Sequence, residues 1–183
     1  MAEPLLRPWS VQDFLEWEAQ QEERFEFIDG RILAMVGGTN AHALIKGNVY
    51  SALRSKLRGH PCRPIVDGPK IVTDLAAYYP DVIVTCEPIL PHADRVDAPV
   101  VVIEVLSRTT ADKDRSAKWT GYQEIPSLRH YVLVWQSEQR VELITRQARG
   151  WYLETIRPPE WQIGLPAVGT ELTLDEIYED SGT

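Results

Sequence analysis

The sequence predicts one α/β domain over residues 1–183, with a mixed central sheet flanked by helices and an N-terminal β-hairpin. Asp29-Gly30 forms a two-residue turn signal between two short strand-like segments. The stretch 99–106 (PVVVIEVL) is almost continuously apolar, which is typical of a strand covered on both faces. Helical spacing of apolar residues over 40–58 and a helix-like segment at 109–124 supply the covering layers.

The other elements follow from local signals. Ser10 with Asp13 resembles a helix N-cap and predicts a helix over 10–20, and Thr173 with Glu176 predicts a short C-terminal helix. The hairpin strands are expected on either side of the Asp29-Gly30 turn. Further strands are expected at 63–66, 69–73, 81–85, 131–135, 141–145 and 151–153.

Composition bounds the class of protein. Hydrophobic residues make up 44% of the chain and charged residues 25%, as in a globular domain. No apolar run approaches the ~20 residues of a membrane span, and the N-terminus lacks a secretory pattern, so cytoplasm is the expected location. Cys62 and Cys86 are far apart in sequence and lack metal-ligand spacing, which argues against a disulfide framework and a structural zinc site.

The net charge of −8 is unevenly distributed along the chain. Residues 1–30 and 160–183 are strongly acidic, whereas 31–159 contain 17 basic and 13 acidic residues. The exposed face of the helix at 40–58 carries Lys46 and Arg54, which are candidate nucleic-acid contacts. The alternative is that the acids only keep the ends of the chain soluble, and charge alone does not decide between the two.

Two carboxylates are the most informative residues. Glu104 interrupts the apolar strand VVVIEVL, and burying an unpaired carboxylate is costly unless a cation compensates it. Asp81 begins another apolar strand, so the two side chains converge if the strands are neighbours. Such a pair is a reasonable Mg²⁺ site, with the Val105 carbonyl as a further ligand. The alternatives are an ion pair for Glu104 and a turn role for Asp81.

The helix after the Glu104 strand offers a cation. Lys118 lies far enough into that helix to point back over the strand end, where it can stabilise a phosphate or orient a water. Tyr122 follows on the same helical face and is a candidate nucleic-acid contact. Lys113 and Arg115 compete for the role of Lys118, and Asp114 is placed to hold Lys118 in position. The alternative for Lys118 is a solvated surface position.

Two more residues are candidates for the same site. Glu26 is flanked by apolar residues in the first hairpin strand and is expected to hold the metal as a third carboxylate; the alternative is an exposed ion pair with Arg24 or Arg31. His42 precedes an amphipathic helix, where it either contacts phosphate, lies near the metal or has no catalytic role.

The order of these motifs resembles the Uma-two (Uma2) family. The motifs are FEFIDGRI, His42, YPDVIV, VVIEVLS, Asp114 with Lys118 and Tyr122, and RHYVLVW. The family consists of bacterial proteins described as restriction endonucleases, within the PD-(D/E)XK nuclease superfamily. The resemblance covers the chain from about Arg24 to Tyr178.

The resemblance implies a restriction-endonuclease-like core. It assigns Asp81 and Glu104 to the acidic positions of the superfamily and Glu26 to the N-terminal acid of the family. The superfamily lysine is expected two residues after Glu104, where this chain has Leu106. The resemblance implies that the lysine has moved to the next helix in families like this one, which points to Lys118.

Together these observations favour a Mg²⁺-dependent endonuclease, with Mn²⁺ as a substitute, that hydrolyses phosphodiester bonds in DNA. A homodimer suits the cutting of two antiparallel strands. One rival is a non-catalytic nucleic-acid-binding or partner-binding module with the same fold. Another is an enzyme of small phosphorylated metabolites, which needs an enclosed pocket. A serine or cysteine hydrolase is disfavoured because the chain lacks a Gly-x-Ser-x-Gly motif and a cysteine–histidine pairing signal.

Overall fold

The computed structural model describes residues 8–35, 37–107 and 111–183, with the side chains of all of these except 111–116. Its centre is a six-stranded sheet with the order β10-β9-β8-β7-β6-β3. The strands are β3 (Arg63–Val66), β6 (Val82–Thr85), β7 (Pro99–Leu106), β8 (His130–Trp135), β9 (Val141–Gln147) and β10 (Gly150–Ile156). β7 lies inside the sheet, as its apolar sequence predicts.

The sheet is mixed, as expected. β7 and β8 pair in parallel, while the other pairings of this sheet are antiparallel. A parallel pair needs a crossover connection, and α3 (Ala111–Tyr122) supplies it. This helix lies within the interval 109–124 that the sequence predicts to be helical, although its first turn follows residues outside the described part.

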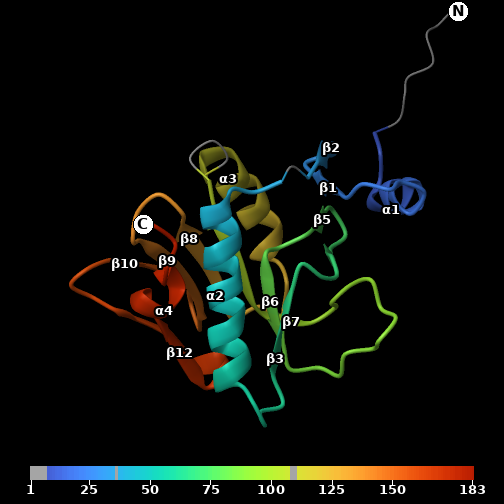
Figure 1. Ribbon diagram of the computed structural model, residues 1–183. Helices are drawn as coiled ribbons and strands as arrows, with labels where there is room; N and C mark the ends of the chain where they lie inside the picture. The colour runs from blue at the N-terminus through green and yellow to red at the C-terminus, as the bar shows by residue number, and fades with distance from the viewer. Residues whose placement is uncertain (1–7, 36, 108–110) are drawn as a thin grey trace, which may run out of the picture.

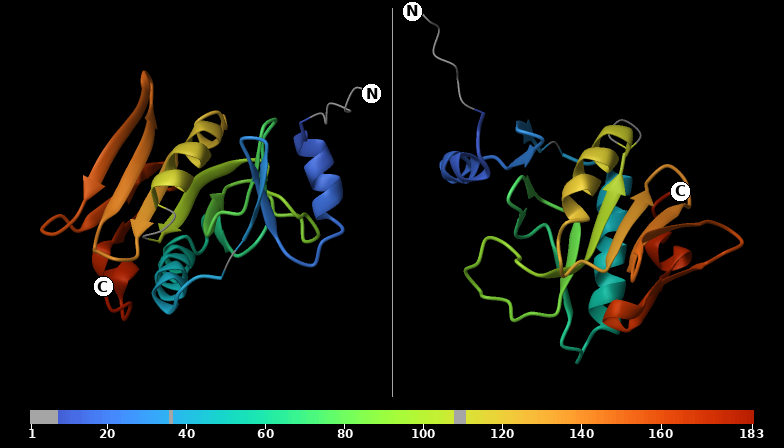
Figure 2. Two further views of the ribbon diagram at one scale, coloured as in Figure 1. Left: turned by 90° about the horizontal axis from the view of Figure 1, so that it is seen from above. Right: turned by 180° about the vertical axis from the view of Figure 1, so that it is seen from behind.

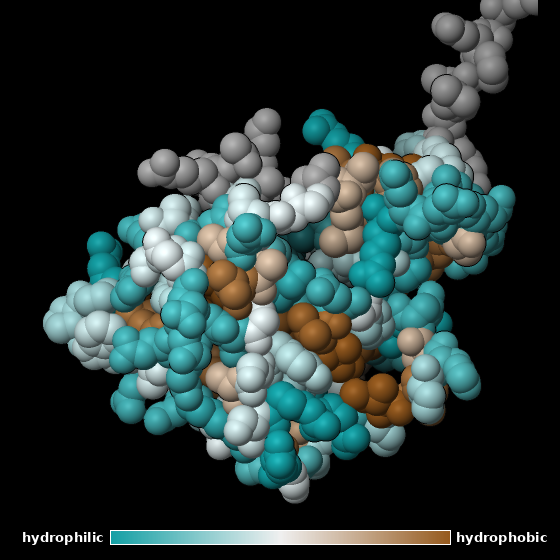
Figure 3. Space-filling model, viewed as in Figure 1, coloured by the Kyte–Doolittle hydropathy of each residue, from teal (hydrophilic) through white to brown (hydrophobic). Residues whose placement is uncertain are grey.

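Two helices cover the two faces of the sheet (Figure 1). α2 (Asn40–Lys56) buries Ile45 and Leu53 in a core on one face, while Tyr122 of α3 packs in a second core that includes Val102. The left view of Figure 2 shows α2 and α3 on opposite sides of the strands. Hydrophilic side chains cover most of the molecular face that α2 fronts (Figure 3).

A second, four-stranded antiparallel sheet lies beside the first and has the order β2-β1-β5-β4. Its strands are β1 (Phe25–Ile28), β2 (Arg31–Ala34), β4 (Ile71–Val72) and β5 (Ala77–Tyr78). The predicted hairpin turn joins β1 to β2, and Asp29 and Gly30 have φ angles of 50° and 74°. Positive φ at both central residues is what a type I′ hairpin turn requires.

Both predicted capping boxes are present at helix N-termini. α1 (Val11–Glu18) follows Ser10, which is capped reciprocally with Asp13, and α4 (Leu174–Tyr178) follows the Thr173–Glu176 box. A small antiparallel sheet that packs near α2 and α4 was not predicted. Its elements are β11 (Gln162–Leu165), the 3-10 helix η1 (Pro166–Val168) and β12 (Thr170–Thr173).

The two cysteines correct the expectation drawn from their spacing. Cys62 and Cys86 form a disulfide, although 24 residues separate them in sequence. In the β3–β6 ladder Arg63 lies opposite Thr85, so the cysteines sit opposite each other one step beyond the paired residues. Strand register, which the sequence spacing does not reveal, brings them together.

The helices of the described ranges are modest in length. The longest of them, α2, has 17 residues and carries Lys46, Arg54 and Lys56. In this part of the chain, no helix combines the length and the apolar character that crossing a bilayer requires.

Candidate active site

Strand register brings Asp81 and Glu104 to neighbouring positions at one end of the central sheet. Val82 lies opposite Ile103 in the antiparallel β6–β7 pair. Asp81 precedes this pair on one strand and Glu104 follows it on the other. Asp81 Oδ2 accepts a hydrogen bond from the backbone N–H of Val105 at 2.7 Å. The structure thus brings together the two carboxylates that the sequence singled out.

Lys118 reaches the same point from α3. Its Nζ lies 2.8 Å from Glu26 Oε1 and 3.2 Å from Glu104 Oε1. Lys118, Glu26 and Glu104 are only 8%, 8% and 7% exposed. Glu26 Oε1 also accepts a hydrogen bond from the backbone N–H of Tyr79 at 2.9 Å. Glu26 is therefore a buried partner of Lys118, and the alternative of an exposed pair with a neighbouring arginine is wrong.

The electrostatic environment of the site shifts the pKa values of Glu104 and Lys118. Burial raises the pKa of Glu104 to about 7, against the attraction of Lys118 and together with repulsion from Asp81 and Glu26. The Tyr122 hydroxyl donates a hydrogen bond to Glu104 Oε1 at 3.0 Å, which favours the charged form. Burial alone would lower the pKa of Lys118, but Glu104 and Glu26 raise it above its ordinary value. Lys118 stays a cation, while Glu104 titrates close to neutral pH.

The N-terminus of α2 adds a histidine to this group. Thr39 caps the helix by accepting a hydrogen bond from the backbone N–H of His42 at 3.2 Å. His42 Nε2 lies 3.2 Å from Asp81 Oδ2. His42 therefore lies beside the carboxylate pair, while its position near a metal and its contact with phosphate stay predictions.

These groups line one cleft of about 570 Å³. Its charged or titratable lining residues are Arg24, His42, Lys46, Lys118, Glu26, Asp67, Tyr79, Asp81 and Glu104. Lys46 Nζ lies 2.7 Å from Asp67 Oδ1, so its charge is partly compensated. Arg54 lies two turns further along α2 and does not line the cleft. Of the two basic residues expected to contact nucleic acid, only Lys46 lies in the cleft.

Tyr122 corrects one predicted role. Its side chain has no exposed surface and lies between Tyr78 and Tyr131, with ring centroids 4.6 and 5.0 Å away. The expectation that it contacts nucleic acid is therefore wrong, because the face of α3 that it shares with Lys118 is turned toward the sheet. Tyr122 instead positions the Glu104 carboxylate through its hydroxyl.

Other predictions about the site stay open. Val105 donates its N–H to Asp81, whereas the ligand role of its carbonyl stays a prediction. The proposed support from Asp114, and the competing roles of Lys113 and Arg115, concern side chains that lie outside the described residues.

Sequence reasoning missed a second buried ionic cluster that supports Glu26. Lys70 Nζ lies 2.6 Å from Glu18 Oε2, and the Tyr79 hydroxyl donates to Glu18 Oε1 at 2.7 Å. Since the backbone N–H of Tyr79 binds Glu26, this cluster fixes the segment that holds the Glu26 carboxylate. The available signal was that Glu18 lies four residues after the apolar Phe14 on the inner side of α1.

The donor set suits a hard divalent cation. Three carboxylates, Glu26, Asp81 and Glu104, face the single charge of Lys118 in this cluster, and their mutual repulsion contributes to the raised pKa of Glu104. Mg²⁺ is commonly held by one or two carboxylates together with waters and substrate oxygens. Asp81 and Glu104 fit that description. A group of three or more His, Cys, Asp or Glu residues arranged to hold a metal is absent from the described residues.

Comparison with known proteins places the chain in a family. Residues 11–175 match the Uma2 model, which is described as "Putative restriction endonuclease". The chain belongs to the Uma2 family. The match spans every candidate site residue from Glu26 to Tyr122 and confirms the resemblance that the sequence motifs indicate.

Two relatives align over most of the chain. An uncharacterized protein of Synechocystis sp., slr1290, is 31% identical over 172 residues, which are 92% of this chain and 90% of that protein. A second, sll1609, is 30% identical over 138 residues, 73% of this chain and 78% of that protein.

A solved structure shares the fold. The crystal structure of a protein from Anabaena variabilis, named as a "putative nuclease belonging to DUF820", superposes with a TM-score of 0.78 at 18% identity. The similarity covers 93% of this chain and 98% of that chain. It confirms the predicted fold of a mixed sheet flanked by helices.

Proposed function

We propose that this Uma2 protein is a divalent-metal-dependent endonuclease that hydrolyses phosphodiester bonds in DNA. The observation that carries the proposal is that Asp81, Glu104 and Lys118, from three separate elements, meet in one cleft. The family description and the name of the Anabaena structure support a nuclease-like function. Metal dependence and the choice of DNA go beyond them and rest on the chemistry of the cleft.

Each residue has a defined role in this proposal. Asp81 and Glu104 would hold Mg²⁺, or Mn²⁺ in its place, and the ion would supply a Lewis acid for phosphate and a more acidic water. Lys118 stabilises the negative charge that develops on the phosphate and orients the attacking water. Glu26 holds the Lys118 ammonium at 2.8 Å, because its carboxylate is itself fixed by the Tyr79 amide.

Two basic side chains and one imidazole at the cleft provide the contact surface for the phosphate backbone. His42, Lys46 and Arg24 line the cleft, and Arg54 continues the basic side of α2 beyond it. A homodimer would present two such clefts to the two strands of a duplex. Light scattering during size-exclusion chromatography tests this part, and a monomer at all concentrations and with bound DNA contradicts it.

Plasmid cleavage tests the proposal directly. Supercoiled DNA is incubated with wild type, Asp81→Asn, Glu104→Gln and Lys118→Met in Mg²⁺, in Mn²⁺ or in chelator. We expect cleavage by wild type that requires the metal, and losses of at least about 100-fold in each variant. Glu87→Gln, which removes an exposed carboxylate outside the cleft, is the matched control. Equal cleavage by wild type and Asp81→Asn rules out this active site.

A non-catalytic module is the second candidate. The observation that favours it is that Lys118 already pairs with Glu26 and Glu104 and so compensates their buried charge. This candidate implies that the protein binds DNA in a gel-shift assay without cleaving it, and that Asp81→Asn binds DNA as wild type does. Metal-dependent cleavage that disappears in the same variant excludes it.

A further inference from the structure

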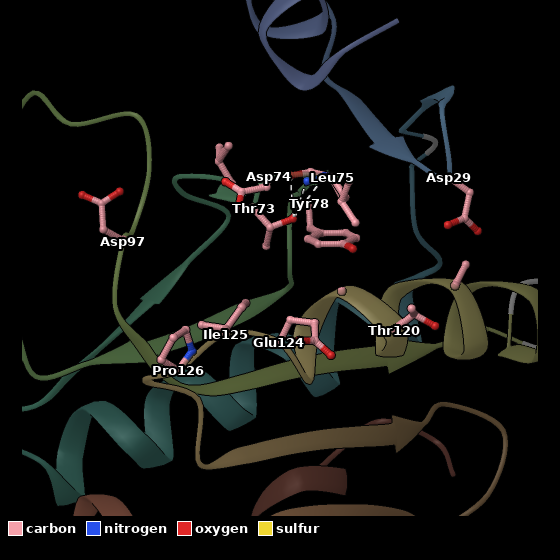
Figure 4. Close-up of a pocket in the computed structure, with 14 residues that line it drawn as sticks. Asp29, Thr73, Asp74, Leu75, Tyr78, Asp97, Thr120, Glu124, Ile125 and Pro126 are labelled. Carbon is pink, nitrogen blue, oxygen red and sulfur yellow. Dashed lines mark hydrogen bonds between the residues drawn. The ribbon is translucent and has the colours of Figure 1, made fainter. Parts of the chain in front are cut away.

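A second cavity lies on another side of α3, outside the candidate active site (Figure 4). Its volume is about 670 Å³, and it shares no lining residue with the cleft that contains Lys118. Figure 4 shows it between the Thr73–Leu75 turn and α3. Tyr78 lines it and packs against Tyr122, so two tyrosine rings separate this cavity from Glu104.

This cavity is lined by acidic side chains, whereas a phosphate-binding site is expected to be lined by basic ones. Its four charged lining residues are Asp29, Asp74, Asp97 and Glu124, and the described lining includes no Lys, Arg or His. Asp97 also lies 3.6 Å from Arg95, so the other three carboxylates contribute most of the negative field. Nucleic acid is repelled from such a cavity, whereas a cation is attracted to it.

The walls favour an organic cation over a metal ion. Val72, Ala76 and Ile125 provide apolar surface inside the cavity, and Leu75 at its edge is 78% exposed. A ligand that combines a positive charge with an aliphatic stem satisfies both kinds of surface.

Tyr78 supplies an independent sign of a ligand. Its side chain is only 1% exposed, and its hydroxyl makes no hydrogen bond with any described residue. In Figure 4 the hydroxyl points toward the side of the cavity where Asp29 lies. Burial, with a smaller contribution from Asp29, raises the pKa of Tyr78 above its ordinary value, so the group stays protonated and uncharged. Its oxygen is not among the fully buried, unpartnered polar atoms of the described residues, so it reaches the space of the cavity, where a ligand can bond to it.

We propose that this cavity binds an aliphatic ammonium ligand, namely a protonated primary amine on a short methylene chain. Asp74 and Glu124 pair with the ammonium group, the stem lies along Val72 and Ile125, and the Tyr78 hydroxyl hydrogen-bonds the polar end of the ligand. This chemistry is present both in a free diamine and in a lysine side chain of a partner. The proposal is independent of nuclease activity, because the cavity shares no residue with the cleft.

Calorimetric titration of the full chain without added metal tests the proposal. The probes are 1,4-diaminobutane for a free amine, N-acetyl-lysine-methylamide for a lysine side chain, and methylammonium as a cation without a stem. The double variant Asp74→Asn with Glu124→Gln removes two cavity carboxylates at exposed positions. Glu87→Gln with Asp175→Asn makes the same change of charge at exposed positions outside the cavity. Tyr78→Phe removes only the hydroxyl.

We expect saturable binding of one equivalent of at least one stem-bearing amine, and at least tenfold weaker binding of methylammonium. The amine that binds more tightly identifies the source. The cavity double variant is expected to bind at least tenfold more weakly, Tyr78→Phe about threefold more weakly, and the control double variant within twofold of wild type. Absence of saturable binding by either amine, or equal weakening in both double variants, overturns the proposal. Asp81→Asn, which changes the cleft and not the cavity, is expected to bind amines as wild type does. A failure of the nuclease proposal can therefore be distinguished from a failure of the amine-binding proposal.

Discussion

Replacement of Lys118 by methionine removes the charge that compensates two buried carboxylates. Methionine keeps an unbranched apolar stem of similar length, so the change isolates the ammonium group. The Lys118 Nζ contacts Glu26 and Glu104 at 2.8 and 3.2 Å, and all three residues are less than a tenth exposed. Breaking a buried pair from one side costs roughly 3–5 kcal/mol. For a domain of this size, the melting temperature falls by about 2–4 °C per kcal/mol, or roughly 6–20 °C in total.

Urea unfolding followed by the fluorescence of the six tryptophans measures this loss. The disulfide is kept oxidised in all samples. Burial raises the pKa of Glu104 to about 7, and removal of Lys118, whose charge lowers that pKa, raises it further. Glu104 is therefore protonated at pH 5 in the variant, and less charge is left unpaired there. We therefore expect a smaller loss of stability at pH 5 than at pH 8. Glu26→Gln added to Lys118→Met removes one of the orphaned charges and is expected to recover part of the loss at pH 8.

Lys46→Met is the matched control for this experiment. Lys46 pairs with Asp67, whose side chain is 66% exposed, so its replacement is expected to cost less than about 1 kcal/mol. The reasoning is refuted if Lys118→Met changes the free energy of unfolding by no more than the control. An equal loss at pH 5 and pH 8 also contradicts it, because the cost is then not electrostatic.

Three further variants test separate parts of the fold. Burial lowers the pKa of His130 from 6.5 to about 4. As the pH falls from 6.5 toward 4, the unfolded chain therefore binds the proton first and the folded state loses stability. His130→Gln is expected to remove at most about 3 kcal/mol of this pH dependence, measured by urea unfolding. A Cβ at Gly121 would overlap the Tyr78 hydroxyl, so Gly121→Ala is expected to cost about 1–3 kcal/mol, partly recovered by adding Tyr78→Phe. Because Cys62 and Cys86 are 24 residues apart, replacing both with serine is expected to cost about 3 kcal/mol.

Each of these three predictions would be contradicted by a specific result. The same pH profile in wild type and His130→Gln means that another group titrates. A Gly121→Ala protein that melts as wild type does means that the Tyr78 ring moves aside at no cost. The double serine variant is compared with wild type in a reducing agent, and a reductant that does not lower wild-type stability means that the cysteines are unpaired in solution.

Local signals were sufficient for most of the elements. The Asp29-Gly30 turn adopts the backbone that its residues favour, and both capping boxes begin helices. These features depend on residues within one turn of the chain, where propensity and side-chain hydrogen bonds decide the conformation. The apolar stretch at β7 was also informative, because a strand with no polar face must be covered on both sides.

The candidate site was only partly predictable. Glu104 was recognisable because a carboxylate within an apolar strand needs a partner, but the sequence did not show that Glu26 shares that partner. The contact between Glu26 and Lys118 joins residues that are 92 positions apart, in different layers of the fold. Tyr122 was assigned to the correct helical face, yet its burial depends on how α3 is rotated over the sheet, which spacing alone does not fix.

Register explains the features that the sequence analysis missed. The disulfide depends on the pairing of β3 with β6, and the short strands β11 and β12 lack a strong alternating pattern. The buried Glu18–Lys70 pair likewise depends on how α1 docks on the smaller sheet. The disulfide, the β11–β12 sheet and the Glu18–Lys70 pair all depend on contacts between residues that are distant in sequence. A single sequence contains little information about such contacts.

Calorimetric titration with Mn²⁺ tests most directly whether Asp81 and Glu104 form a metal site. We expect wild type to bind Mn²⁺ saturably in the cleft, and Asp81→Asn and Glu104→Gln to bind at least about tenfold more weakly. Glu87→Gln is expected to bind as wild type does. Wild type that binds no Mn²⁺, or variants that bind it as tightly as wild type, would contradict the claim that these carboxylates hold a catalytic ion.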